Sequence, residues 1–236
     1  MFSSMSVMTL FKKQTFNGDK KNLVHFLVPY EKRFLKAVLP LVPLQVGAIH
    51  LTLMTVVWSI GIVVAGYFSR EDIRWMGVFN GLILMQYITD MLDGEVGRVR
   101  NNGLIKWGFY MDHFLDYIFL CSIIIGYSFL LPTSCFFLTL LCLSLMGGFM
   151  VHAFMDFSIT HHFKISCNQF GVSEMRWTLI LFNILLIFFG KGLLSQVFPF
   201  VIMAAFIGLC SLVYASQKIY RHMDTLEQAR IDEINQ

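Results

Sequence analysis

The chain has 236 residues, of which 56% are hydrophobic and only 14% are charged. A soluble domain of ordinary composition carries roughly 25% charged residues, so this chain has too few charges to cover a water-exposed surface. A disordered chain is excluded as well, because such chains are poor in apolar residues. The composition therefore predicts an integral membrane protein.

Six apolar stretches predict six transmembrane helices in a bilayer core about 30 Å thick. The fold expected is a single all-α membrane domain over residues 1–236, with no internal repeat. Its predicted parts are a polar arm at 1–21, an interfacial helix at 22–39, a six-helix core at 44–217 and a cytoplasmic tail at 218–236. The spans are expected at 44–68, 75–89 (running on into a polar segment), 107–131, 134–157, 177–190 and 193–216.

The segment at 22–39 precedes the first span and carries apolar residues at helical spacing. Its charged side chains, among them Lys32, Arg33 and Lys36, point in other directions. This pattern predicts an amphipathic helix at the cytoplasmic membrane surface, kinked or interrupted at Pro29. The alternative is a solvated basic arm that leads into the first span.

Basic residues are unevenly distributed between the two ends of the predicted spans. Of the 18 lysines and arginines, only Arg70, Arg74 and Lys191 fall in loops on the side opposite the termini. The positive-inside rule therefore places both termini and the second and fourth loops in the cytoplasm. We expect a multi-pass protein of a bacterial inner membrane or an equivalent membrane, whose basic arm meets lipid headgroups and no nucleic acid.

Four aspartates lie at the cytoplasmic boundary of the second and third spans: Asp90, Asp93, Asp112 and Asp116. Charge is costly at membrane depth, so such residues are candidates for function. Spacings of three and four residues place each pair on one helical face, and the short connection brings the two faces together. Four carboxylates at one place need a counterion, and oxygen ligands favour Mg²⁺ or Mn²⁺.

Small residues and a guanidinium accompany these aspartates. Three glycines on the carboxylate faces leave room for a bulky ligand: Gly94, Gly97 and Gly108. Arg98, one turn further on, suits a phosphate group. A metal, a phosphate and this space are typical of phosphoryl transfer. Two alternatives use the same aspartates, namely solvated helix ends and an intramembrane cation or proton transporter.

The string D-M-L-D-G-E-V-G-R at 90–98, followed by Gly108, Asp112 and Asp116, resembles the signature of the CDP-alcohol phosphotransferase family. That signature reads D-x2-D-G-x2-A-R-x8-G-x3-D-x3-D. In this chain a glycine replaces its alanine, and the spacer after the arginine is one residue longer. Upstream, Leu51-Thr52 resembles the end of the family's P-N-x-L-T segment. The six spans and the preceding amphipathic helix also resemble the family.

Family members transfer a substituted phosphate from a CDP-linked alcohol to a second alcohol and release CMP in phospholipid biosynthesis. The resemblance implies a two-metal Mg²⁺ or Mn²⁺ site held by the four aspartates, with Asp116 also acting as the general base. It further implies a homodimer, a CDP-linked lipid or aminoalcohol donor, and an alcohol acceptor. Contacts to the CDP part of the donor are expected from Gly94, Gly97, Arg98, Gly108 and Thr52.

The identity of the two alcohols stays open. Asp112-His113-x-x-Asp116 resembles the D-H-x-x-D of choline and ethanolamine phosphotransferases, whereas the length and the six spans resemble compact enzymes that use CDP-diacylglycerol. Acceptor contacts are expected at His113, Glu174 and Arg176. The alternatives are an interfacial histidine at 113 and a helix start followed by a positive-inside arginine at 173–176.

Overall fold

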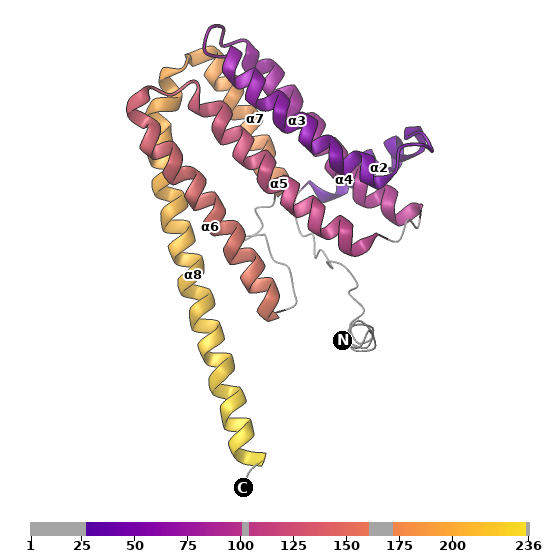
Figure 1. The fold of residues 1–236 in the computed structure, drawn as a ribbon, viewed down its shortest axis with the longest axis vertical. Coiled ribbons are helices and arrows are strands. Elements are labelled where there is room, and N and C mark those ends of the chain that lie inside the picture. The colour runs from indigo at the N-terminus through magenta and orange to yellow at the C-terminus, as the bar shows by residue number, and fades with distance from the viewer. Residues whose placement is uncertain (1–26, 101–103, 161–171, 235–236) are drawn as a thin grey trace, which may run out of the picture.

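The computed structural model describes residues 27–100, 104–160 and 172–234. These residues form seven α-helices and two short 3₁₀ helices, and no strand occurs among them, which confirms the predicted all-α architecture (Figure 1). The α-helices are α2 (Val28–Val38), α3 (Ala48–Phe68), α4 (Trp75–Val99), α5 (Ile105–Ser128), α6 (Phe136–Thr160), α7 (Val172–Phe189) and α8 (Gly192–Ile234). The 3₁₀ helices are η1 (Leu39–Leu41) and η2 (Thr133–Cys135).

Four helices of the described part are long and apolar enough to cross a membrane: α3, α5, α6 together with η2, and α8. They support a multi-pass membrane protein. α4 has sufficient length, but Asn80, Gln86 and Asp90 interrupt its apolar residues and lower its hydropathy. The count of six spans stays a prediction, because it needs α4 and α7 as well.

The tightest packing joins α3 to α4 and α5. A Cβ atom added to Gly66 of α3 would lie 2.5 Å from the Cα of Gly126 in α5, so the two backbones touch and only glycine fits there. Ile62 and Phe79 are fully buried beside this contact, in a core that α7 completes. The core thus fixes α4 and α5 on α3, and these two helices carry the aspartates.

A second layer consists of α6 and α8, which lie side by side (Figure 1). Apolar residues such as Cys142, Phe198 and Ile202 are buried between them. α8 runs on past the end of α6 as one helix of 43 residues, which corresponds to about 65 Å at about 1.5 Å per residue. The predicted last span and most of the predicted tail are therefore parts of one continuous helix.

A buried polar network joins α4, α5 and α7 within this core. The Tyr127 hydroxyl donates to Asn183 Oδ1 at 2.6 Å, and Asn183 Nδ2 donates to Asn80 Oδ1 at 2.8 Å. Asn80 Nδ2 in turn donates to the backbone oxygen of Ile180 at 3.2 Å. These bonds fix the register of α7 against its two neighbours.

α2 lies beside the end of α4 that carries the aspartates. Pro29 stands in its first turn, where a missing N–H needs no helical partner, and the helix continues to Val38. The beginning of the predicted interfacial helix, at 22–26, lies outside the described residues. The segment after α2 is tied to α4 because Arg100 donates to the backbone oxygens of Val42 and Val46 at 2.9 and 2.5 Å.

Candidate active site

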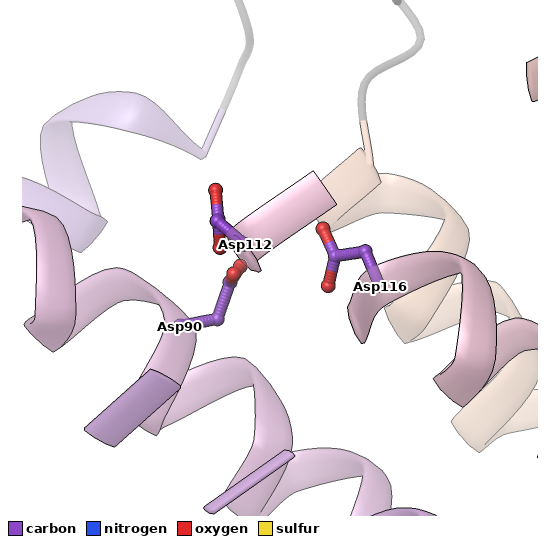
Figure 2. Close-up of side chains that lie close together, drawn as sticks. All are labelled: Asp90, Asp112 and Asp116. Carbon is purple, nitrogen blue, oxygen red and sulfur yellow. The ribbon is translucent and has the colours of Figure 1, made fainter. Parts of the chain in front are cut away.

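Three carboxylates converge where α4 faces α5. One oxygen each of Asp90, Asp112 and Asp116 lies within 4.8 Å of the others, and all three residues are partly buried. Figure 2 shows Asp90 reaching from α4 toward the two aspartates of α5. Because Asp112 and Asp116 are four residues apart, they share one face of α5. Such closely spaced carboxylate oxygens form a ligand set for a hard divalent cation.

Asp93 stands beside this group, one turn further along α4. It is 8% exposed, and its Oδ2 accepts a hydrogen bond of 2.7 Å from the hydroxyl of Thr52 on α3. Its carboxylate is close enough to that of Asp112 to interact with it electrostatically. The structure therefore gathers three of the four predicted metal ligands and holds the fourth next to them. Thr52, predicted to contact CDP, contacts Asp93.

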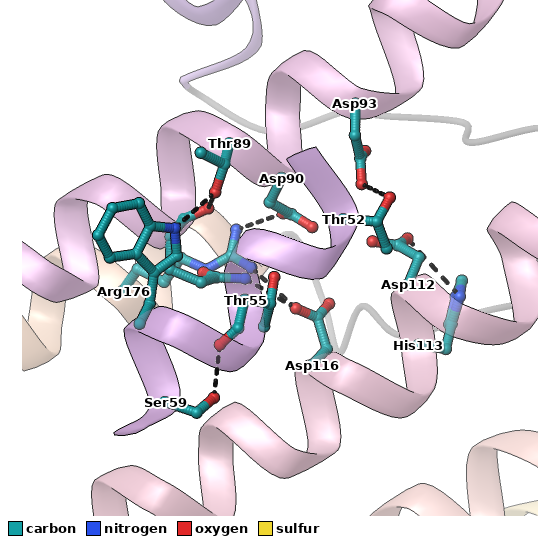
Figure 3. A network of polar contacts seen from close by, with 12 residues as sticks. Thr52, Thr55, Ser59, Thr89, Asp90, Asp93, Asp112, His113, Asp116 and Arg176 are labelled. Carbon is teal, nitrogen blue, oxygen red and sulfur yellow. Dashed lines mark hydrogen bonds and ion pairs between the residues drawn. The ribbon is translucent and has the colours of Figure 1, made fainter. Parts of the chain in front are cut away.

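A buried arginine from α7 supplies positive charge to this group. Arg176 Nη1 donates to Asp90 Oδ2 at 2.8 Å, and Nη2 donates to Asp116 Oδ1 at 3.4 Å (Figure 3). The residue is only 8% exposed. Three carboxylates and one guanidinium leave a formal charge of −2, which equals the charge that one divalent cation neutralises. The site thus fits a metal even with its own arginine in place.

Arg176 is itself held by an aromatic residue of α4. Its Cζ atom lies 5.4 Å from the centre of the Tyr87 ring, which is cation–π geometry. The Tyr87 hydroxyl donates to Glu31 Oε1 of α2 at 2.5 Å, and Trp177 meets the same ring edge-on at 6.3 Å. These contacts link the short helix α2 to the cation of the site.

Gln86 is a site residue that the sequence patterns did not single out. It is fully buried on α4, one turn before Asp90, and its Nε2 donates to Asp116 Oδ1 at 3.0 Å. A single glutamine in an apolar run has no local signal that separates it from a residue of the helix core.

The face of α3 toward the site is polar. Thr52, Thr55 and Ser59 are each 5% exposed. In Figure 3, Thr52 meets Asp93, Thr55 lies beside Arg176, and Ser59 lies beyond Thr55. The Ser59 hydroxyl donates to the backbone oxygen of Thr55 at 2.7 Å. Only Thr52 was predicted, although hydroxyls at spacings of three and four in an apolar span mark such a buried face.

The predicted donor-binding residues lie close to the aspartates along α4 and α5. A Cβ atom added to Gly108 would meet nothing within 4 Å, whereas one added to Gly97 would make an ordinary contact of 3.6 Å with Ala48. At Gly94 it would lie 3.7 Å from the guanidinium of Arg98. Arg98 is exposed and pairs with Glu95 at 2.5 Å, so its guanidinium is accessible from water.

The remaining predicted acceptor residues lie on α5 and α7. His113 is 7% exposed; its Nδ1 is 2.8 Å from the backbone oxygen of Phe109 and 3.8 Å from Asp112 Oδ2. Its ring also packs near that of Phe154 on α6. Glu174 lies in the first turn of α7, two residues before Arg176. Of the predicted acceptor set, Arg176 donates hydrogen bonds to two carboxylates of the group, and His113 lies beside the third.

Comparison with known proteins decides the family. The family model for CDP-alcohol phosphatidyltransferase matches residues 46–214, which is most of the chain and includes every site residue named above except Glu31. The chain belongs to the CDP-alcohol phosphatidyltransferase family. No curated protein and no solved structure matches it.

Membership confirms the predicted resemblance and the predicted class of enzyme. The chain is a membrane transferase of substituted phosphate groups in phospholipid biosynthesis. This CDP-alcohol phosphatidyltransferase carries its partly buried acidic group, Asp90, Asp112 and Asp116, inside the matched range. The family is metal-dependent in general, and this group is the place where a metal fits.

Proposed function

We propose that this enzyme moves a substituted phosphate from CDP-diacylglycerol or a CDP-aminoalcohol to an acceptor alcohol and releases CMP, in a metal-dependent reaction. The observation that carries the proposal is the group of Asp90, Asp112 and Asp116, with oxygens within 4.8 Å of one another at the signature positions. Arg176 beside it adds a cation that is suited to phosphate. The family match favours this reaction over the alternative of a cation or proton transporter.

The residues proposed to hold two Mg²⁺ or Mn²⁺ ions are Asp90, Asp93, Asp112 and Asp116. When bound, the ions neutralise charge on the donor diphosphate and on the departing CMP. Four carboxylates and Arg176 carry a formal charge of −3. Two divalent cations would exceed this by one positive charge. The loaded site would therefore attract the anionic diphosphate.

Asp116 is the proposed general base. It takes the proton of the acceptor hydroxyl while that oxygen forms a bond to the phosphorus that carries the donor alcohol. The bond from this phosphorus to the bridging oxygen breaks, and CMP leaves with the electron pair. Gln86 and Arg176 both donate to Asp116 Oδ1, and this supports a fixed orientation of the carboxylate.

The proposed donor contacts follow the signature. Gly94 and Arg98 meet the CDP group, Gly97 and Gly108 leave space for it, and Thr52 acts on it through Asp93. Arg176, His113 and Glu174 are proposed to meet the acceptor. Of these, Arg176 has the strongest support, because it already touches Asp116.

We also propose six spans, α3 to α8, with the site and both termini in the cytoplasm and α2 at the membrane surface. The distribution of charge supports this orientation. Arg98 and Arg176 lie on the parts of α4 and α7 near the aspartates, and Arg100 follows the end of α4 directly. At the other ends of these helices, the Lys191 ammonium donates to the backbone oxygen of Arg70 between two loops. The proposed homodimer rests on family likeness.

Exchange of labelled CMP tests the reaction. Membranes that contain the protein, with Mg²⁺ or Mn²⁺ and labelled CMP, should form labelled CDP-alcohol from endogenous or added phospholipid. Membranes with an Asp112→Asn variant serve as the control and should form none. Absence of exchange with every lipid and alcohol tried, accompanied by metal-dependent ion flux, would instead favour the transporter.

A further inference from the structure

Gln86 has a second polar atom that the contacts described above do not use. Its side chain is fully buried, and its Oε1 has no hydrogen-bond partner among the described residues. A buried carbonyl without a donor costs free energy, which an apolar side chain of similar size would avoid. The bond of Nε2 to Asp116 therefore does not by itself account for a glutamine at this position.

Covalent geometry places this oxygen near the proposed base. The amide nitrogen faces Asp116 Oδ1 at 3.0 Å, as electrostatics require, since a carbonyl oxygen turned toward the carboxylate would be repelled. The carbonyl oxygen lies about 2.3 Å from the nitrogen of the same amide, so it is at most about 5.3 Å from Asp116 Oδ1. A hydroxyl at Asp116 and a donor on the next carbon can reach both atoms at once.

We propose that Gln86 completes the acceptor subsite: Nε2 orients Asp116, and Oε1 accepts a hydrogen bond from a hydroxyl or ammonium group on the carbon next to the reacting hydroxyl. This inference rests on the proposed function. Arg176 Nη2 donates to the same oxygen of Asp116 at 3.4 Å, so the acceptor hydroxyl would share this carboxylate with the guanidinium.

The proposal selects a substrate class. A small polyol or a primary amino alcohol has the required second donor beside its reacting hydroxyl. Diacylglycerol has an ester on the neighbouring carbon and offers no donor to Gln86. The acceptor is therefore the small polar alcohol, and the CDP-linked partner is the lipid.

Paired acceptors test this on the purified full-length chain in lipid vesicles with CDP-diacylglycerol and Mg²⁺. Each pair differs in the second donor: ethanolamine with 1-propanol, and glycerol 3-phosphate with 3-hydroxypropyl phosphate. For its preferred acceptor, the wild type should favour the donor-bearing member by about 10-fold or more in kcat/KM, the size of one hydrogen bond at a buried site.

Gln86→Met keeps the length of the side chain and removes both polar atoms. It should bring the ratio within each pair close to one and raise the KM for the donor-bearing acceptor, with the KM for CDP-diacylglycerol unchanged. Gln86→Glu keeps an acceptor oxygen but loses the donor to Asp116, so it should lower kcat while retaining part of the preference. The matched control is Thr139→Val on α6, which removes a buried hydroxyl that donates to the backbone oxygen of Cys135 at 3.2 Å and should leave the ratio intact.

Two outcomes would overturn the inference while leaving the proposed function standing. One is an unchanged ratio in Gln86→Met. The other is efficient transfer by the wild type from a CDP-aminoalcohol to diacylglycerol. Failure of the wild type to exchange CMP with any donor is a different result, because it removes the proposed function itself.

Discussion

Replacing Arg176 by methionine should destabilise the protein strongly, because the change leaves carboxylates in a partly buried place without their cation. Arg176 is 8% exposed and lies 2.8 Å from Asp90 Oδ2 and 3.4 Å from Asp116 Oδ1. Loss of one partner of a buried ion pair costs about 3–5 kcal/mol. Since Asp90 and Asp116 keep some contact with water, we expect the lower end, about 3 kcal/mol.

For a chain of this size such a loss lowers the melting temperature by roughly 10 °C. Thermal unfolding in detergent, followed by tryptophan fluorescence with a chelator present, measures it. Saturating Mg²⁺ should reduce the difference, because a divalent cation on the same carboxylates takes over the neutralisation. The control is Arg74→Met: Arg74 is 86% exposed in its 3.6 Å pair with Asp72, so its loss should cost less than about 1 kcal/mol.

A double mutant separates charge from packing. Asp90→Asn in the Arg176→Met background removes one of the stranded charges and should recover about 1–3 kcal/mol of the loss. The reasoning is refuted if Arg176→Met has the melting temperature of the wild type in the absence of metal. It is also refuted if the effects of Asp90→Asn and Arg176→Met on the free energy of unfolding simply add. Either result would mean that the guanidinium does not neutralise this group.

Three further predictions concern the base, the metal and the packing. Asp116→Asn should keep metal and CDP-donor binding in calorimetry but lower turnover by more than about 100-fold, so near-normal turnover would exclude Asp116 as the base. Chelation should abolish CMP exchange, and Mg²⁺ or Mn²⁺ should restore it; exchange that survives chelation would contradict the metal requirement. Gly66→Val should reduce the folded yield, because its Cβ would lie 2.5 Å from the Gly126 backbone, whereas Gly81→Ala, with nothing within 4 Å, should not.

The convergence of Asp90 with Asp112 and Asp116 could be predicted from the sequence because it depends on local geometry. Helical spacing sets the face of each pair, and the short connection between α4 and α5 brings the faces together. The location of the three-carboxylate group therefore needed no knowledge of the other helices. The position of Asp93 could not be predicted in this way, because its partner Thr52 lies on a different helix, α3.

Arg176 could not be placed in the same way. It follows Asp116 by 60 residues, and only the packing of α7 on α4 brings it to the aspartates. Hydropathy counts treat a charge as a group that must reach water, so the predicted span began at 177, after the arginine. In the structure α7 begins at 172, and the charge is buried because its partners are carboxylates.

The position of Arg176 in turn depends on contacts well away from the aspartates. Asn183 lies seven residues further along α7, two turns on and therefore on the same face as Arg176. Its bonds to Asn80 and to the Tyr127 hydroxyl hold this face against α4 and α5. A slip of α7 by one residue would break both bonds and rotate the guanidinium away from Asp90 by about 100°. The buried amides therefore set the register of α7 in the active site. Helices that meet through apolar side chains alone can pack in several neighbouring registers of similar energy. Only one of these registers places the Arg176 guanidinium among the carboxylates.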